Sequence, residues 1–380
     1  MTYPTISHFI ESLTGIFIPL PIQTFGFFIV LAFITGAHFI KSGFVKLEKE
    51  KIFKSISIEN RKNKIEIFFD YFINGLMAFF FGYKITYILQ NYTLFSESPQ
   101  SVLLSSNGNT LLGLVLLVIS IIYIYYNNKK HKPTTIQVLP SELSWNFMFV
   151  AAISGIIGAK LFAVLEDIPY LLQDPISALF SFSGLTFYGG LIMGTICVII
   201  YAKKHHISIP RLADVFAPAL ILAYGIGRLG CHFSGDGDWG IISNMSNKPF
   251  LFPEWLWGYN FPHNVIETGV KIENCVGKYC HELPYLVYPT SLYEATFGIM
   301  AFLFLWHLRK YISIPGILFC IYLILNGLER FLIEFIRVTD KYNIIGLELT
   351  QAQVIAILLI IIGAVGIFFL KKKGDSNELI

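Results

Sequence analysis

Long runs of apolar residues are the feature of this sequence that most restricts its fold. They are about 17–22 residues long, which is enough to cross a hydrocarbon core of about 30 Å as helices. Only 14% of the 380 residues are charged, whereas a soluble domain has about 25%, so few charges remain to cover a water-exposed surface. We therefore predict an all-α polytopic membrane protein with about nine transmembrane helices. The expected spans are residues 19–40, 66–90, 110–126, 145–165, 184–202, 213–233, 290–308, 314–336 and 350–370.

Along the chain, loops rich in lysine and arginine alternate with loops that contain few or none of these residues. The loop after the first span is rich in both, whereas residues 91–109 and 166–183 contain neither. Loops rich in lysine and arginine remain in the cytoplasm. We therefore predict that the N-terminus lies outside and that the C-terminus, with a tail of residues 371–380, lies in the cytoplasm.

The longest segment on the outer side, residues 234–288, is expected to form a small periplasmic cap. It contains Cys275 and Cys280, five positions apart. Disulfides persist on this side of a bacterial membrane. We predict a disulfide between them, with two free thiols as the alternative.

The expected eighth span contains an unusual stripe of polar residues. Helical spacing would place Asn326, Arg330, Glu334 and Arg337 on one face. An arginine at the centre of a bilayer costs about 2.5–3.5 kcal/mol on insertion scales, so each one needs a reason. One interpretation is a salt-bridged structural stripe. The other is a cationic site for an anion, because the planar guanidinium donates two hydrogen bonds to a phosphate.

A second polar segment, residues 225–240, contains six glycines together with Arg228, His232, Asp236 and Asp238. Glycine allows non-helical turns and close approach of a substrate. A glycine seam for helix packing is the alternative, but it does not explain the charges. The two aspartates lack the spacing and the terminal glutamate of an EF-hand loop, so no metal is expected.

Two further segments lie where spans meet the outer side. Residues 183–190 contain Tyr188, which by itself is typical of an interfacial aromatic. Residues 288–295 contain Glu294, which enters the seventh span almost immediately. Because all four polar segments fall in the outer halves of spans, we expect them to converge on one site.

Together these segments resemble the prolipoprotein diacylglyceryl transferase family over residues 145–370, with a weaker match in the first span, residues 1–44. Five stretches follow the family's landmarks in order, and residues 45–144 then become an insertion with two extra spans. The stretches are Gly158-Ala-Lys160, Tyr188-Gly-Gly-Leu-Ile-Met-Gly194, Gly227-Arg-Leu-Gly230 to Trp239-Gly240, Pro289-Thr-Ser-Leu-Tyr-Glu-Ala295 and Arg330-Phe-Leu-Ile-Glu-Phe-Ile-Arg337.

The resemblance implies transfer of the diacylglyceryl group of phosphatidylglycerol to a prolipoprotein cysteine, with release of glycerol 1-phosphate and no cofactor. It implies a bacterial inner-membrane enzyme with its site toward the outer face, whose partners are phosphatidylglycerol, prolipoprotein signal peptides and the bilayer, and no nucleic acid. Arg228 and Arg330 would hold the departing phosphate, and Tyr188 and His232 complete the expected catalytic set. The expected substrate-binding residues are Lys160, Gly189, Gly190, Gly230, Asp236, Asp238, Gly240, Tyr293, Glu294, Asn326, Glu334 and Arg337.

This chain departs from the family pattern at Tyr188, where the family has histidine. A tyrosine, with a pKa of about 10, stays protonated near neutral pH. We predict that it donates a hydrogen bond to the lipid, with interfacial packing as the alternative. Proton removal from the thiol would then fall to His232, Asp236 or water, with His232 slightly favoured.

The inserted segment has a faint likeness to the core. Gly82-Tyr-Lys84 is similar to Gly158-Ala-Lys160, and both lie on helices that are expected to run outward. A duplication would explain this, but chance similarity between two apolar helices is the favoured interpretation.

Other functions remain open at this point. A relative of the transferase could use another acceptor or be inactive. A lipid or anion transporter would also use buried arginines, but transporters commonly show inverted repeats, and the single likeness here runs in the same direction.

Overall fold

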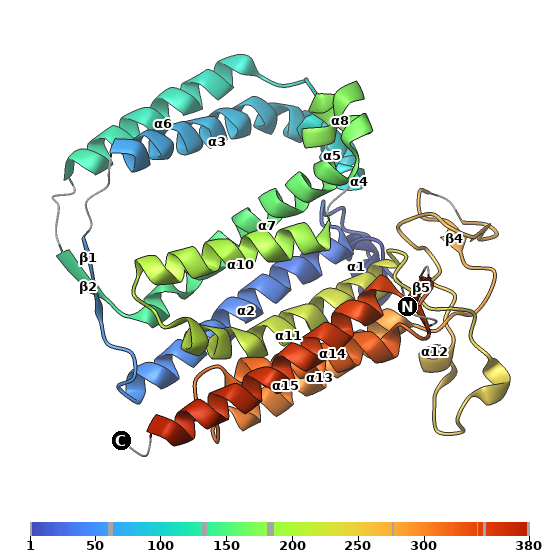
Figure 1. Cartoon of the computed structure of the whole chain (residues 1–380). Coiled ribbons are helices and arrows are strands. Elements are labelled where there is room, and N and C mark those ends of the chain that lie inside the picture. The colour runs from blue at the N-terminus through green and yellow to red at the C-terminus, as the bar shows by residue number, and fades with distance from the viewer. Residues whose placement is uncertain are drawn as a thin grey trace. The chain divides into compact units, whose positions relative to one another are not determined.

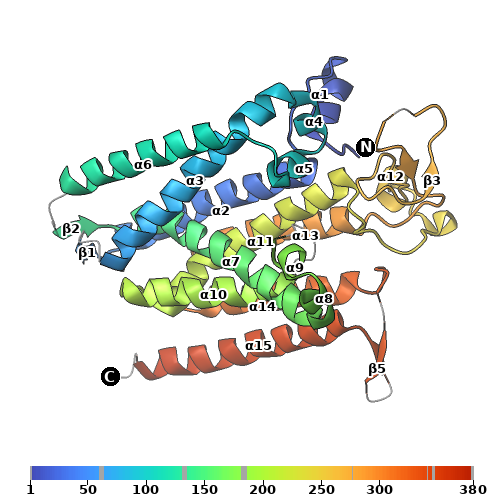
Figure 2. The same ribbon diagram turned by 90° about the horizontal axis from the view of Figure 1, so that it is seen from above.

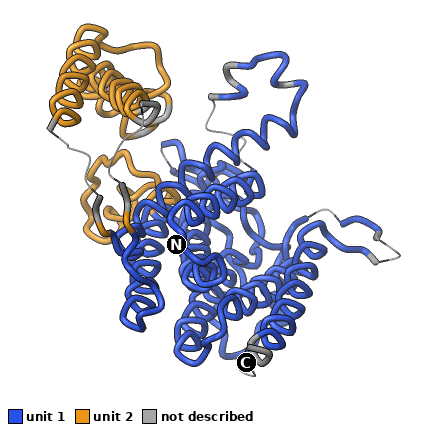
Figure 3. Tube along the Cα trace, turned by 60° about the vertical axis from the view of Figure 1, so that its left-hand side comes forward, with its two compact units in different colours: residues 1–2, 28–56, 138–380 blue, residues 3–27, 57–137 orange. Residues whose placement is uncertain are grey.

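The computed structural model describes residues 2–59, 64–130, 135–180, 186–275, 277–339, 341–344 and 347–377 (Figure 1). The expected start of the fifth span at 184–185 and the tail residues 378–380 lie outside them. The chain divides into two compact units (Figure 3). We call residues 1–2, 28–56 and 138–380 the larger unit, and residues 3–27 and 57–137 the smaller unit.

Each of the nine expected spans coincides with a long helix. They are α2 (Thr24–Lys49), α3 (Lys64–Gln90), α6 (Thr110–Lys130), α7 (Ser144–Glu166), α10 (Phe187–Lys204), α11 (Ile209–Ser234), α13 (Thr290–Leu308), α14 (Ile317–Ile333) and α15 (Gln351–Asn377). Within the described residues, eight helices are long and apolar enough to cross a membrane. The ninth, α14, has 17 residues, or about 26 Å. The prediction of an all-α polytopic membrane protein is confirmed.

Shorter elements connect the long helices. The helices are α1 (Ile6–Thr14), α4 (Tyr92–Glu97), α5 (Pro99–Leu104), α8 (Ile168–Gln173), α9 (Pro175–Phe180), α12 (Glu254–Trp257) and the 3-10 turns η1 (Pro140–Leu143) and η2 (Met245–Asn247). Three two-stranded sheets pair β1 (Ile56–Glu59) with β2 (Thr135–Val138), β3 (Val270–Lys271) with β4 (His281–Glu282), and β5 (Tyr342–Ile344) with β6 (Leu347–Leu349).

Helices α11, α13, α14 and α15 lie side by side in the larger unit (Figure 1 and Figure 2). Helix α11 is the most buried span of the chain's described part. Its Ile221 and Leu222 pack against Phe302 and Leu305 of α13 and Leu318 of α14. By contrast, α15 exposes large apolar side chains along its length. Such a surface suits contact with lipid, and the helix satisfies its own backbone hydrogen bonds there.

The two hairpins α3–α6 and α7–α10 have the same plan. Helices α4 and α8 have six residues each and begin 76 positions apart, and α5 and α9 repeat both the length and the spacing. The last residues of α3 and α7, Gln90 and Glu166, are also 76 positions apart. Chance similarity does not account for three pairs of elements in one register, so the structure favours the duplication.

In each hairpin the two helices cross at a pair of glycines, and the two pairs occupy corresponding positions. A Cβ atom at Gly82 would lie 2.9 Å from Gly113 Cα, and one at Gly158 would clash with the Gly189 oxygen. Both pairs are 31 residues apart along the chain. The buried Lys84 donates to the Val102 oxygen at 3.0 Å and to the Asn107 oxygen at 3.1 Å. In the first copy, this lysine therefore fastens the connecting loop to its helix.

The expected cap lies at the ends of α11 and α13 (Figure 1). A disulfide joins Cys275 to Cys280 within it. The buried Asn264 donates to the main-chain oxygens of Phe261, Thr268 and His281 at 3.0–3.2 Å. These bonds order a segment that has little regular structure of its own.

Candidate active site

Two glycines bring α11 and α13 into close contact. A Cβ atom at Gly225 would lie 3.1 Å from the Ala295 oxygen, and one at Gly298 would lie 3.0 Å from Gly225 Cα. Larger residues would hold the helices apart. Arg228 and Glu294 each lie about one turn beyond this crossing, and the antiparallel helices place them at the same end.

Glu294 is the centre of an ion-pair cluster. Its side chain is fully buried, so its charge must be compensated by neighbours. One carboxylate oxygen lies 3.1 Å from Arg228 Nε, and the other lies 3.1 Å from Arg337 Nη1 and 3.4 Å from Arg330 Nη1. A single carboxylate therefore contacts three arginines from three separate segments.

Two further carboxylates complete the cluster. Asp238 pairs with Arg228 and, at 2.8 Å, with Arg337 Nη2. Burial alone would raise the pKa of Asp238, but the two guanidinium groups outweigh it and hold the pKa below its usual value. Glu334 lies 3.2 Å from Arg330 Nη2. Three carboxylates thus fix the orientations of three arginines before any ligand binds.

The arginines remain accessible despite these pairs. Their side chains are 19% (Arg228), 28% (Arg330) and 13% (Arg337) exposed. Each guanidinium has five N–H donors, so some can face a ligand while others hold a carboxylate. Such a group of oriented cations is suited to an anion that carries several acceptor oxygens, such as a phosphate.

The position of Arg337 corrects the helical-face prediction. Helix α14 ends at Ile333, so Arg337 does not continue the stripe of Asn326 and Arg330. Instead, residues 336–337 pair with the loop after α11, where Ile241 N donates to the Ile336 oxygen at 2.9 Å and Gly240 forms a bridge with Arg337. The arginine still reaches the cluster, but through a strand-like contact with the loop.

Replacing Gly240 with alanine is expected to disturb this contact. The new Cβ atom would lie 2.5 Å from the Ile336 oxygen, so the two backbones would have to separate and Arg337 would shift. We expect destabilisation of about 1–3 kcal/mol, typical of an overpacked site, together with a large loss of activity. Thermal unfolding and an activity assay check this.

Gly75→Ala serves as the matched control, since nothing lies within 4 Å of a Cβ atom there. Unfolding temperatures that fall equally in both variants would contradict the explanation by close approach.

Comparison with known proteins identifies the family. Residues 114–369, about two thirds of the chain, match the model for prolipoprotein diacylglyceryl transferase. The chain belongs to this family. It is 33% identical over 232 residues to phosphatidylglycerol–prolipoprotein diacylglyceryl transferase of Staphylococcus saprophyticus, covering 61% of this chain and 75% of that protein. The equivalent enzyme of Oceanobacillus iheyensis is 28% identical over 271 residues, covering 70% and 86%.

The family segment at the start of α10 lies against α7. A Cβ atom at Gly190 would lie 3.0 Å from the Gly155 oxygen, and one at Gly189 would lie only 2.5 Å from the Gly158 oxygen. Packing therefore accounts for both glycines, and their contact with substrate stays a prediction. Tyr188 is 41% exposed beside Phe187, and its role as a hydrogen-bond donor stays a prediction. The role of Lys160 also stays a prediction.

The two residues predicted as candidates for the thiol base, His232 and Asp236, lie in different environments. His232 is buried among the rings of Tyr259 and Phe261. Asp236 is half-buried, and its carboxylate, the Asp238 carboxylate and the Cys231 sulfur all lie within 4.8 Å of one another. Asp238 is paired with two arginines of the cluster. Asp236 lies next to Asp238 and so adjoins the cluster, whereas the ring of His232 lies among aromatic side chains.

Three further residues predicted to bind substrate, Tyr293, Gly230 and Asn326, lie on the helices that carry the cluster. The Tyr293 hydroxyl donates to the Leu256 oxygen and so ties α13 to the cap. Gly230 is buried in α11, and Asn326 is half-buried in α14.

Two residues that the sequence analysis missed adjoin the cluster. The hydroxyl of Tyr224 donates to Glu329 at 3.2 Å, and its ring lies against Arg228. Glu329 is also buried. The signal was present, because Tyr224 precedes Arg228 by four residues and Glu329 adjoins Arg330.

Proposed function

We propose that this chain transfers the diacylglyceryl group of phosphatidylglycerol to the lipobox cysteine of prolipoproteins, the first step of lipoprotein maturation. The cysteine sulfur attacks the diacylglyceryl carbon that carries the phosphate. A carbon–sulfur bond forms, the carbon–oxygen bond breaks, and glycerol 1-phosphate leaves with the bonding electrons. The thiol proton passes to a base.

The observation that carries this proposal is the convergence of Arg228, Arg330 and Arg337 on the buried Glu294. The leaving phosphate gains negative charge as the carbon–oxygen bond breaks. Cations that are already oriented stabilise this charge without reorganising at the moment of reaction. Family membership supports the same activity.

Reconstitution with phosphatidylglycerol and a lipobox peptide tests the proposal. Mass spectrometry should show that the peptide gains one diacylglyceryl group, and that it gains nothing when its cysteine is replaced by serine. Folded protein that produces no such adduct would contradict the proposal. An adduct on another thiol would indicate a different acceptor.

We assign proton removal to Asp236. Burial raises its pKa, and the neighbouring Asp238 carboxylate raises it further. A carboxylate with a raised pKa is a stronger base than an ordinary one. His232 was slightly favoured from the sequence, but its ring lies among aromatic side chains.

Transfer should therefore weaken as the pH falls through the raised pKa of Asp236, since protonation removes the base. The same shift has a consequence for stability. A carboxyl whose pKa is raised by folding favours the folded state at low pH, and this contribution is lost as the pH rises through the raised value. Asp236→Asn should thus slow transfer by about 10²–10⁴-fold and raise the unfolding temperature at neutral pH.

Transfer rates and unfolding temperatures between pH 4 and 8 check both effects, with exposed Glu273→Gln as the control. If Asp236→Asn keeps the acid limb and His232→Gln removes it, the base is His232.

We place the protein in the cytoplasmic membrane of a bacterium, with the arginine cluster toward the outer face. The alternation of lysine and arginine between loops supports this. Asn247 in the cap and Lys373 at the end of α15 are both exposed, so they are suitable positions for thiol labelling on the two predicted sides.

In a Cys197→Ser background, an impermeant thiol reagent should label Asn247→Cys in intact cells. It should label Lys373→Cys only after permeabilisation. The buried Cys231 and Cys320 and the bonded cap pair should not react. The reverse pattern would invert the orientation.

A further inference from the structure

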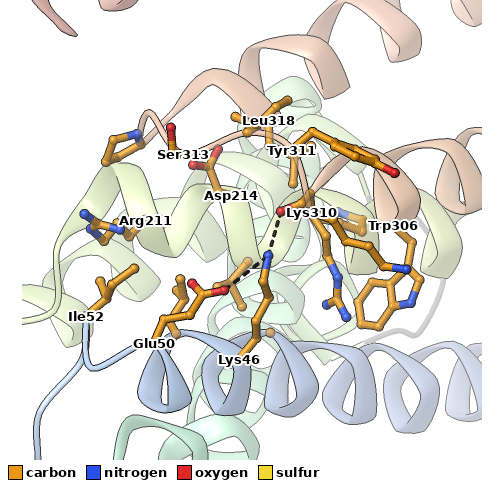
Figure 4. A pocket seen from close by; sticks show the side chains of 17 residues that line it. Lys46, Glu50, Ile52, Arg211, Asp214, Trp306, Lys310, Tyr311, Ser313 and Leu318 are labelled. Carbon is orange, nitrogen blue, oxygen red and sulfur yellow. Dashed lines mark hydrogen bonds and ion pairs between the residues drawn. The ribbon is translucent and has the colours of Figure 1, made fainter.

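A cavity of about 470 Å³ lies at the opposite ends of the same helices. Its walls come from the end of α2, the start of α11, the end of α13 and the start of α14 (Figure 4). Along α11, Arg211 at the cavity precedes Arg228 by 17 residues, which is about 26 Å of helix. The cavity is therefore a separate site from the arginine cluster.

Four cationic residues line this cavity: Lys46, Arg211, Arg309 and Lys310. Arg211 and Lys310 have no side-chain hydrogen bond or ion pair among the residues that the structure describes. Arg309 lies over the ring of Trp306, and its buried Nε has no partner within the described chain. Burial lowers the pKa of Arg309 to about 10, as expected of a poorly solvated charge.

Two carboxylates line the same cavity, and both are already engaged. Asp214 accepts from Gly316 N at 2.6 Å and from Phe319 N at 2.9 Å, so it caps the start of α14. Glu50 lies 3.6 Å from Lys46 Nζ (Figure 4). Asp214 also acts electrostatically on Arg211, and Glu50 on Arg309. Four cations against two acids still leave the cavity with an excess of two positive charges.

The remaining walls are apolar and aromatic. Val215 and Leu318 form buried parts of the lining, whereas Tyr311 is 71% exposed at its edge. Tyrosine and tryptophan at a span end are typical of the interface between lipid and water. A basic pocket between helices at the lipid–water interface suits a phospholipid headgroup, because its cations can contact the phosphate and its apolar groups can contact the acyl region.

We propose that this cavity binds the phosphate headgroup of an anionic phospholipid from the leaflet next to the lysine-rich loops, predicted to be the cytoplasmic one. Arg211, Arg309 and Lys310 contact the phosphate. Trp306 and Tyr311 lie beside the glycerol region. This lipid is a bound component of the fold, and it does not take part in the transfer at the arginine cluster.

Photocrosslinking tests the site. The full-length protein in nanodiscs receives phosphatidylglycerol with a diazirine on its headgroup, and crosslinked peptides are mapped by mass spectrometry. Wild type should be labelled within residues 306–318. The double variant Arg211→Gln/Lys310→Gln should lose about 30-fold in apparent affinity, because each cation near an anionic headgroup contributes about a factor of five. Lys203→Gln, which removes an exposed cation of α10 outside the cavity, should label like wild type.

Competitors distinguish the sources of the phosphate. Unlabelled phosphatidylglycerol should reduce labelling of residues 306–318, whereas phosphatidylethanolamine and soluble glycerol 1-phosphate should not. Equal competition by glycerol 1-phosphate would overturn the lipid assignment in favour of a soluble phosphate ester. Labelling that the double variant leaves unchanged, or its absence from residues 306–318, would overturn the site. Because peptide mapping separates this label from any label near Arg228, the result does not depend on the proposed transfer.

Discussion

Replacing Glu294 with glutamine is expected to abolish transfer and to destabilise the protein. The variant keeps the size of the side chain but removes the carboxylate that contacts Arg228, Arg330 and Arg337. Three guanidinium groups would then face one another around a neutral centre. Breaking a buried ion pair by removing one partner costs about 3–5 kcal/mol. Losing the orientation of three arginines should also lower kcat/KM by more than about 100-fold.

Unfolding and transfer have to be measured on the same preparation, so that loss of activity is not confused with loss of fold. Glu348→Gln, at an exposed position of β6, controls for the change in net charge. A Glu294→Gln variant with wild-type stability and turnover would show that the central carboxylate does not organise the cluster.

Replacing either Arg228 or Arg330 with lysine is expected to remove most activity although the charge is kept. Arg228 contacts two carboxylates through different nitrogens, and so does Arg330. A lysine has one nitrogen and lacks the planar fork, so it cannot keep both contacts and also reach a phosphate. The loss should be about 2.7–4 kcal/mol of transition-state stabilisation, the scale of one oxyanion donor, or about 10²–10³-fold in kcat.

Steady-state kinetics on folded Arg228→Lys and Arg330→Lys check this expectation. A fall in kcat with little change in KM would indicate contacts made mainly in the transition state. Near wild-type turnover in either variant would show that charge alone suffices at that position.

The spans could be predicted because they depend on local composition. A run of about 20 apolar residues must form a helix in lipid, whatever surrounds it. At the eighth span, expected at 314–336, α14 ends three residues early, at Ile333. Its end is set by the pairing of residues 336–337 with the loop at Gly240, which comes from a distant part of the sequence.

The duplication shows a different limit. The two hairpins share a register of 76 residues, but the sequence signal that was recognised is a short glycine–lysine likeness at Lys84 and Lys160. Apolar residues exchange freely on lipid-facing surfaces, so identity is lost there. The lengths of the short helices α4, α5, α8 and α9 preserve the relation.

The sequence by itself determined the membrane class, the nine long helices of the described residues and the family, and it singled out Arg228, Glu294 and Arg330 as unusual charges in apolar surroundings. Only the tertiary structure decided that Glu294 is the centre of the cluster, that Arg337 arrives from a loop contact and that Asp236 rather than His232 adjoins it. The physical reason is that burial and pairing of a charge depend on which segments meet in space. The close crossing at Gly225 and Gly298 determines that meeting, and no periodicity within a single helix encodes it.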